Sequence, residues 1–215
     1  ENENAKTIFL EFWHYCLPFV PFAFMSFFYE FADRWMLQHW GGSIEQAYYG
    51  VASRVSTIAL LATTSILKIF WKEIAEANHL NNKELVKNLY LKVSRLLYCA
   101  GALFVGFLLP WTEEILLITL GKEYIGGVLT LTIMFLYPIH QSMGQIGGTM
   151  LLATEKTSLH IKIVLIFMML SVVVSYFLQA PSSAPLPGLG LGSTGLAFKM
   201  ICIQFLQVNV IAFYL

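Results

Sequence analysis

Charged side chains are scarce in this sequence. Only 12% of its 215 residues are Asp, Glu, Lys or Arg, whereas 57% are hydrophobic. A soluble domain carries about 25% charged and about 45–50% apolar residues, so this shortage excludes an ordinary water-soluble fold. Thirteen basic residues balance thirteen acidic ones, and a net charge of zero gives no electrostatic reason to expect a nucleic-acid partner. We therefore expect membrane lipid to surround most of the chain.

Cysteines and enzyme motifs are equally sparse. Cys16, Cys99 and Cys202 each lie in an apolar run without a C-x-x-C pair, which argues against a disulfide framework or a zinc site. The sequence has no H-E-x-x-H, P-loop or G-x-S-x-G motif. It therefore predicts neither an enzyme nor a protein with a metal or another cofactor. Because it begins without methionine and ends in an apolar run, we also expect it to be a piece of a longer protein.

Long apolar runs are abundant. A transmembrane helix needs about 20 mainly apolar residues to cross about 30 Å of hydrocarbon. Six stretches meet or approach this length, and they are continuous rather than alternating, which favours helices over the strands of a barrel. They cover residues 8–37, 47–71, 96–119, 125–154, 161–179 and 192–215. The sequence predicts an all-α transmembrane fold in which residues 1–215 form a single six-helix lobe.

Basic residues fall on one side of these predicted helices. The connection between the second and third of them holds or borders Lys68, Lys72, Lys83, Lys87, Lys92 and Arg95. Because short basic loops stay in the cytoplasm, this connection and the N-terminal flank are predicted to be cytoplasmic. The segment 81–97 within it fits either an amphipathic helix on the membrane surface or an extension of the third helix.

Cations inside the predicted spans are the first candidate functional groups. Each ionisable residue costs at least about 2.5–3.5 kcal/mol to place in lipid, so it usually faces the bundle interior. Arg54 begins a helical stripe that continues through Thr57 and Leu61 to Lys68. We expect this stripe to border a water-filled cavity that holds an anion, the alternative being an arginine that reaches the lipid headgroups. Lys199 has the same two interpretations.

The fourth predicted helix carries His140, Gln141 and Gln145 near its middle. These side chains could bind a substrate by hydrogen bonds, and His140 could titrate. The alternative is that they join neighbouring helices. Gly144-x-x-x-Gly148 in the same helix would permit a close helix contact.

A cluster of charges lies at the end of the first predicted helix. Glu30 and Arg34 are four residues apart and can form an ion pair, whereas Asp33 points in another direction. The three residues are predicted to form either an outer gate or an ion-pair network at the membrane interface.

Four short segments together resemble one known family. They are Asp33-Arg34 with Tyr48-Tyr49-Gly50-Val51-Ala52-Ser53-Arg54, Leu120-Gly121-Lys122-Glu123-Tyr124, Leu151-Leu152-Ala153-Thr154-Glu155-Lys156, and Gly192-Ser193-Thr194-Gly195-Leu196-Ala197. With these four segments in this order, the chain resembles the C-terminal half of polysaccharide flippases. These are the O-antigen or lipid-linked oligosaccharide translocases of the multidrug/oligosaccharidyl-lipid/polysaccharide exporter superfamily.

This resemblance implies a twelve-helix, two-lobed protein of the bacterial inner membrane, with this chain as helices seven to twelve. Such a protein flips undecaprenyl-pyrophosphate-linked oligosaccharide by alternating access, for polysaccharide or O-antigen (lipopolysaccharide) biosynthesis. The resemblance implies that Arg54 contacts the anion, followed by Lys199 and His140. The implied partners are the missing N-terminal lobe, a polysaccharide polymerase and the chain-length machinery.

Two other functions, drug export and glycan polymerisation or transfer, require different sequence features. An ion-coupled multidrug exporter of the same superfamily should carry buried acids in mid-helix, whereas the acids here fall near the ends of the predicted helices. A membrane-embedded glycan polymerase or transferase should carry a large external catalytic loop, and the external connections here are short.

Overall fold

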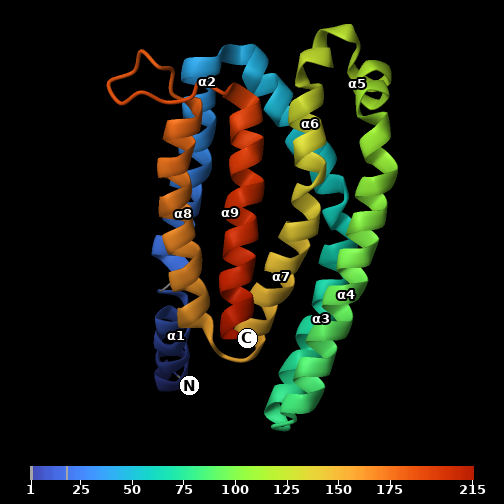
Figure 1. The fold of residues 1–215 in the computed structure, drawn as a ribbon. Coiled ribbons are helices and arrows are strands. Elements are labelled where there is room, and N and C mark those ends of the chain that lie inside the picture. The colour runs from blue at the N-terminus through green and yellow to red at the C-terminus, as the bar shows by residue number, and fades with distance from the viewer. Residues whose placement is uncertain (1, 18) are drawn as a thin grey trace.

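The chain folds into a bundle of helices in the computed structural model, which describes residues 2–17 and 19–215, with the side chains at 2–6, 14, 15, 19 and 62 left undescribed (Figure 1). Its helices are α1 (Asn2–Cys16), α2 (Phe19–Ile58), α3 (Leu60–His79), α4 (Lys83–Leu108), α5 (Thr112–Leu120), α6 (Val128–Phe135), α7 (Tyr137–Ala153), α8 (Thr157–Gln179) and α9 (Gly192–Tyr214), with short 3-10 turns η1 (Leu109–Trp111) and η2 (Lys122–Gly127). The described residues contain no strand, so the predicted all-α class is confirmed. Residue 18, inside the first predicted helix, lies outside the described residues.

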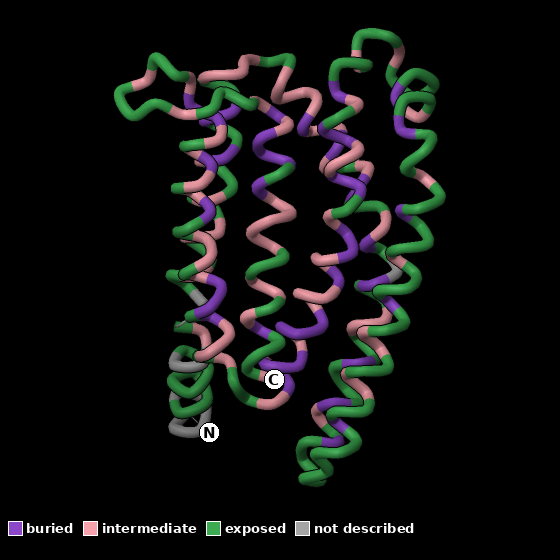
Figure 2. Tube along the Cα trace, viewed as in Figure 1, coloured by how far each residue is buried: buried purple, intermediate pink, exposed green. Residues whose placement is uncertain are grey.

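Several helices can cross a membrane. Three units in the described part of the chain are long and apolar enough, namely α4 with α5 (Lys83–Leu120), α8 and α9. A fourth is present if α2 and α3 are counted as one bent span. Large apolar side chains cover the outside of the bundle, where Figure 2 shows many exposed positions; Ile118 is 82% exposed and Phe107 72%. An apolar surface this extensive suits lipid rather than water, so the chain is a membrane protein.

The connection between the first two predicted helices is helical rather than a loop. α2 runs from Phe19 to Ile58 and changes direction at Gly42, whose φ is +77°. This left-handed conformation is open to glycine because it has no Cβ. One residue therefore supplies the turn that was expected to take residues 38–46.

The second predicted helix, 47–71, is broken near its middle. α2 ends at Ile58 and α3 begins at Leu60. Just before the break, the hydroxyls of Ser56 and Thr57 each donate, at 2.7 Å, to the backbone carbonyl four residues earlier. Such bonds compete with the backbone hydrogen bonds of the helix and often bend it.

Prolines divide two further predicted spans. Pro110 lies in η1, which separates α4 from α5. Pro138 is the second residue of α7, after the break that ends α6 at Phe135. Proline lacks an N–H and clashes with the preceding turn, so it is tolerated at a helix start but not inside the helix.

Residues 83–97 of the segment 81–97 belong to α4. This helix begins at Lys83, where the Asn82 side chain accepts a 3.0 Å hydrogen bond from the Leu85 N–H, and it continues without interruption to Leu108. Of the two interpretations, the extension of the third predicted helix is confirmed. Val86 and Leu97 on this helix pack in one apolar cluster with residues of α3 and α7.

Two apolar clusters hold the helices on either side of the site. In the first, Leu37 of α2, Phe135 of α6 and Leu196 of α9 are fully buried together. In the second, Ile74 of α3 and Ile146 of α7 are fully buried against α4. Between lipid-embedded helices such side chains hold by van der Waals packing, because lipid is as apolar as they are. The clusters fix the distance between α2, α7 and α9, which border the cavity described next.

Candidate functional site

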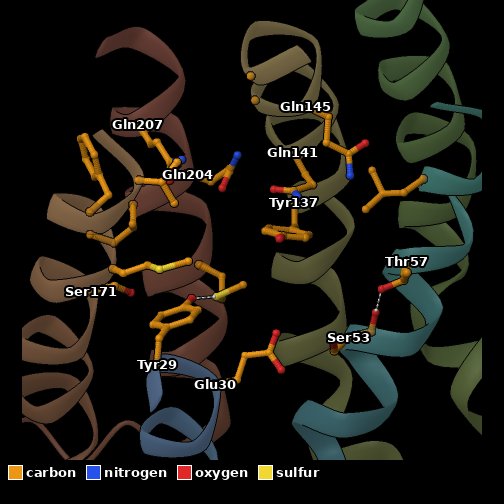
Figure 3. Close-up of a pocket in the computed structure, with 18 of the residues that line it drawn as sticks. Tyr29, Glu30, Ser53, Thr57, Tyr137, Gln141, Gln145, Ser171, Gln204 and Gln207 are labelled. Carbon is orange, nitrogen blue, oxygen red and sulfur yellow. Dashed lines mark hydrogen bonds between the residues drawn. The ribbon is translucent and has the colours of Figure 1, made fainter. Parts of the chain in front are cut away.

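A cavity of about 730 Å³ opens mainly between α2, α3, α7, α8 and α9 (Figure 3). Amide side chains form much of its polar wall. Gln141 and Gln145 reach it from α7, and Gln204 and Gln207 reach it from α9. Residues three or four positions apart lie on one helix face, so each helix presents both of its amides to the same space.

Hydroxyl groups face the same cavity from other helices. Ser53 and Thr57 of α2, Tyr137 of α7 and Ser171 of α8 all border it. Thr57 already donates to the carbonyl of Ser53, as Figure 3 shows. The hydroxyl of Tyr29 contacts the sulfur of Met200 at 3.2 Å. The wall therefore mixes hydroxyls, amides and aromatic edges.

Two polar atoms on residues that border this cavity have no hydrogen-bond partner among the described residues. They are Gln145 Oε1 and His160 Nδ1. The hydroxyl of Ser171, which is only 1% exposed, interacts with the Tyr29 hydroxyl. A buried polar atom without a partner costs about 1–3 kcal/mol, so these two atoms favour a hydrogen bond with water or a polar ligand. The cavity is built for polar contents.

The Asp, Glu, Lys and Arg residues in the described wall all lie on one helix. Glu30, Asp33 and Arg34 of α2 are the Asp, Glu, Lys and Arg residues that border the cavity within the described part of the chain. Glu30 and Arg34 do not come within ion-pair distance of each other. Arg34 is exposed, and its guanidinium is the basic group that this cavity offers to an anion.

Asp33 makes a different ion pair from the one expected at this cluster. Its carboxylate accepts from the Lys199 ammonium at one oxygen and from the Ser175 hydroxyl at the other. Lys199 is fully buried, and its Nζ lies 4.8 Å from the centre of the Tyr29 ring. A buried charge is tolerated when paired and hydrogen-bonded. Lys199 does not border the cavity; it neutralises Asp33 behind the wall and ties α9 to α2.

Arg54 and His140 also lie outside the cavity wall. Arg54 is exposed on α2, next to the cavity residue Ser53. The stripe expected from Arg54 to Lys68 is not continuous, because the break between α2 and α3 interrupts the helical register. The ring of His140 packs edge-on against Phe205, with 5.3 Å between ring centres.

The glycines of α7 shape the cavity. A methyl group on Gly144 would lie 2.3 Å from the amide nitrogen of Gln204, and one on Gly148 would lie 2.8 Å from the His160 ring. The Gly144-x-x-x-Gly148 motif thus allows the predicted close contact, with α9 through Gly144 and with α8 through Gly148. It makes room for two polar side chains of the cavity.

Comparison with protein-family models, curated proteins and solved structures finds no match to this chain. The geometry of the site itself is therefore the basis for a proposed function. In the described residues, no group of three or more His, Cys, Asp or Glu side chains could hold a metal ion.

A second, smaller cavity of about 200 Å³ lies at the start of α9. Glu45 of α2 borders it and accepts a 2.7 Å hydrogen bond from the Ser193 N–H in the first turn of α9. A carboxylate at a helix N-terminus is favourable, because the helix dipole is positive there. Gln179, which is 2% exposed, also borders this cavity, and neither polar atom of its amide has a partner among the described residues.

Gln204 and Gln207 were not predicted as site residues, nor was the pairing of Asp33 with Lys199. Gln204 and Gln207 are polar residues three positions apart in an apolar helix, a signal that could have identified them. The pairing of Asp33 with Lys199 has no such signal, because it joins residues 166 positions apart and depends on how three helices pack.

Proposed function

We propose that the chain is one lobe of a transporter that flips an undecaprenyl-pyrophosphate-linked oligosaccharide across the bacterial inner membrane by alternating access. The observation that carries the proposal is a polar cavity inside a bundle whose outer surface is apolar. A lipid-linked sugar is amphipathic in the same way. Its glycan needs a hydrated path lined with hydrogen-bonding groups, while its lipid tail stays in the bilayer. The proposed role is movement rather than covalent chemistry, so the protein is not an enzyme.

In this proposal the chain crosses the membrane six times. The helical units are α1 with the first part of α2, the second part of α2 with α3, α4 with α5, α6 with α7, α8, and α9. The N-terminus and the α3–α4 connection face the cytoplasm, because basic residues gather there. The open side of the cavity faces a second lobe in the longer protein. A polysaccharide polymerase and the chain-length machinery are the proposed functional partners.

Arg34 is the proposed contact for the pyrophosphate. A guanidinium offers several donors in a planar fork that matches phosphate oxygens, and Arg34 is exposed on the wall of the cavity. Arg54 lies beside the wall residue Ser53 and does not itself border the cavity. Its proposed role is therefore to contact the anion at the rim of the cavity.

An Arg34→Ala substitution in the full-length protein tests this role. Export of surface glycan should fall at least about tenfold, because charge-assisted hydrogen bonds contribute about 1.5–3 kcal/mol. The lipid-linked precursor should accumulate in the inner leaflet, while membrane insertion stays normal. Arg95→Ala is the matched control, since Arg95 is an exposed arginine of α4 away from the cavity. Normal export by Arg34→Ala, or an equal loss in the control, would remove the proposal.

One observation favours a second candidate, an ion-coupled small-molecule exporter. Asp33 is only 5% exposed and lies among α2, α8 and α9, whereas its sequence position had suggested a residue near a helix end. Buried membrane acids commonly serve proton or sodium pathways. This candidate predicts drug efflux that depends on pH or sodium and is abolished by Asp33→Asn. It also predicts that deleting the gene leaves surface glycan unchanged.

A further inference from the structure

The wall that α7, α8 and α9 contribute to the large cavity contains no Asp, Glu, Lys or Arg among the described residues. The charged groups of the cavity are confined to α2. Gln141, Gln145, Gln204 and Gln207 supply the polar character of the other side instead. From this separation, and resting on the proposed function, we infer that the wall of α7–α9 is a subsite for uncharged sugar units that carry hydroxyl or acetamido groups. The pyrophosphate lies at the α2 side.

The hydrogen-bonding capacity of the wall indicates the ligand. Gln145 Oε1 is a buried acceptor without a partner among the described residues, so it favours a ligand that donates a hydrogen bond. A sugar hydroxyl or an acetamido N–H donates, whereas an ionised carboxylate only accepts. His160 Nδ1 likewise has no partner among the described residues in the same wall. An amide carries a donor and an acceptor side by side, and adjacent hydroxyls of a sugar ring can use both.

The α7 glycines place these groups close together. The amide of Gln204 lies over Gly144, and the ring of His160 lies over Gly148, one turn further along the same helix. Side chains from α9 and α8 therefore converge on α7 at adjacent turns. The aromatic ring of Tyr137, also in this wall, offers an apolar surface of the kind on which a sugar ring can stack. An acidic sugar placed here would lose water without gaining a cation, which is unfavourable.

The experiment compares two substrates in proteoliposomes that contain the full-length protein. Both probes are fluorescent undecaprenyl-pyrophosphate lipids with a trisaccharide. In one probe all three sugars are neutral, and in the other the middle sugar is the corresponding uronic acid. Flipping is measured by the rate at which an added membrane-impermeant quencher loses access to the labelled lipid. The neutral probe should move about tenfold faster, because the acidic probe is expected to lose about two hydrogen bonds of ordinary strength to the wall.

Variants of Gln204 connect the preference to the wall. Gln204→Leu should slow the neutral probe about two- to tenfold, as expected for one lost hydrogen bond. Gln38→Leu, an exposed glutamine outside the cavity, is the matched control and should not slow it. Gln204→Lys should narrow the preference for the neutral probe by supplying a cation. The Gln204→Lys protein is compared with wild type at equal amounts of folded, inserted protein.

The outcomes separate the two proposals. If neither probe moves in the wild-type protein, the proposed function is wrong. If the acidic probe moves as fast as the neutral one, or Gln204→Lys leaves the ratio unchanged, transport stands and the neutral-sugar subsite is wrong. The subsite is supported if the wild-type protein moves the neutral probe faster and Gln204→Lys lowers the ratio of the neutral rate to the acidic rate.

Discussion

Substituting Lys199 with methionine tests the buried ion pair that ties α9 to α2. Methionine nearly preserves the length and apolar stem of lysine and removes the charge together with the hydrogen-bond donors of the ammonium. Asp33 would keep its hydrogen bond from Ser175 but would lose its counter-ion while remaining 5% exposed. The variant therefore leaves a carboxylate in a site from which water is largely excluded.

The expected loss follows from burial. Removing one partner of a buried pair destabilises by about 3–5 kcal/mol, because the remaining charge is uncompensated. At about 1.4 kcal/mol per decade, the unfolding equilibrium constant should rise about 140-fold for a loss of about 3 kcal/mol and about 3,700-fold for a loss of about 5 kcal/mol. In the double variant Asp33→Asn with Lys199→Met, both charges are absent, so the protein should be more stable than Lys199→Met alone.

The measurement is reversible unfolding of the purified full-length protein in detergent micelles, followed by far-UV circular dichroism. Lys87→Met is the matched control, because Lys87 is an exposed lysine of α4, and it should change the free energy of unfolding by less than about 0.5 kcal/mol. The reasoning is refuted if Lys199→Met is as stable as this control. It is equally refuted if the double variant loses the full sum of the two single losses, since independent sites add.

Three further substitutions test other parts of the fold by the same unfolding measurement or by transport. Gly42→Ala should cost about 1–2 kcal/mol from backbone conformation alone, because φ is +77° and no atom lies within 4 Å of the added methyl; an unchanged stability would contradict the turn. Gly144→Ala should lower the flipping rate by displacing Gln204, and a normal rate would show that this amide has no role. Glu45→Gln should cost about 0.3–1 kcal/mol by removing the negative charge at the start of α9, a loss that high salt should reduce; the same loss at all salt concentrations would argue against a dipole effect.

Hydropathy was sufficient to predict helices, because length and apolar character alone decide whether a segment can cross lipid. It did not predict where they bend. Pro110 and Pro138 mark two of the breaks in the sequence, whereas the break after Ile58 has neither proline nor glycine and coincides with hydroxyl bonds of Ser56 and Thr57 to the backbone.

The site was predicted where local spacing determines it and missed where packing determines it. Gln141 and Gln145 lie in the cavity wall, the location that their predicted substrate contact requires. For Arg54 and Lys199 the sequence left two interpretations open, a cavity wall or a reach to the headgroups, because a position within a span does not specify the direction of its side chain. Lys199 turns toward Asp33, and Arg54 lies on an exposed face of α2.

The balance of charge beside the cavity has a kinetic consequence. Glu30 and Asp33 of α2 are matched there by Arg34 and by Lys199, two acids by two bases, so these four residues add no net charge that would attract an anion from a distance. Attraction over distance scales with net charge and is screened by salt over about 8–10 Å. In the proposed transport, this group of charges should therefore add little dependence on ionic strength to the rate at which an anion is captured.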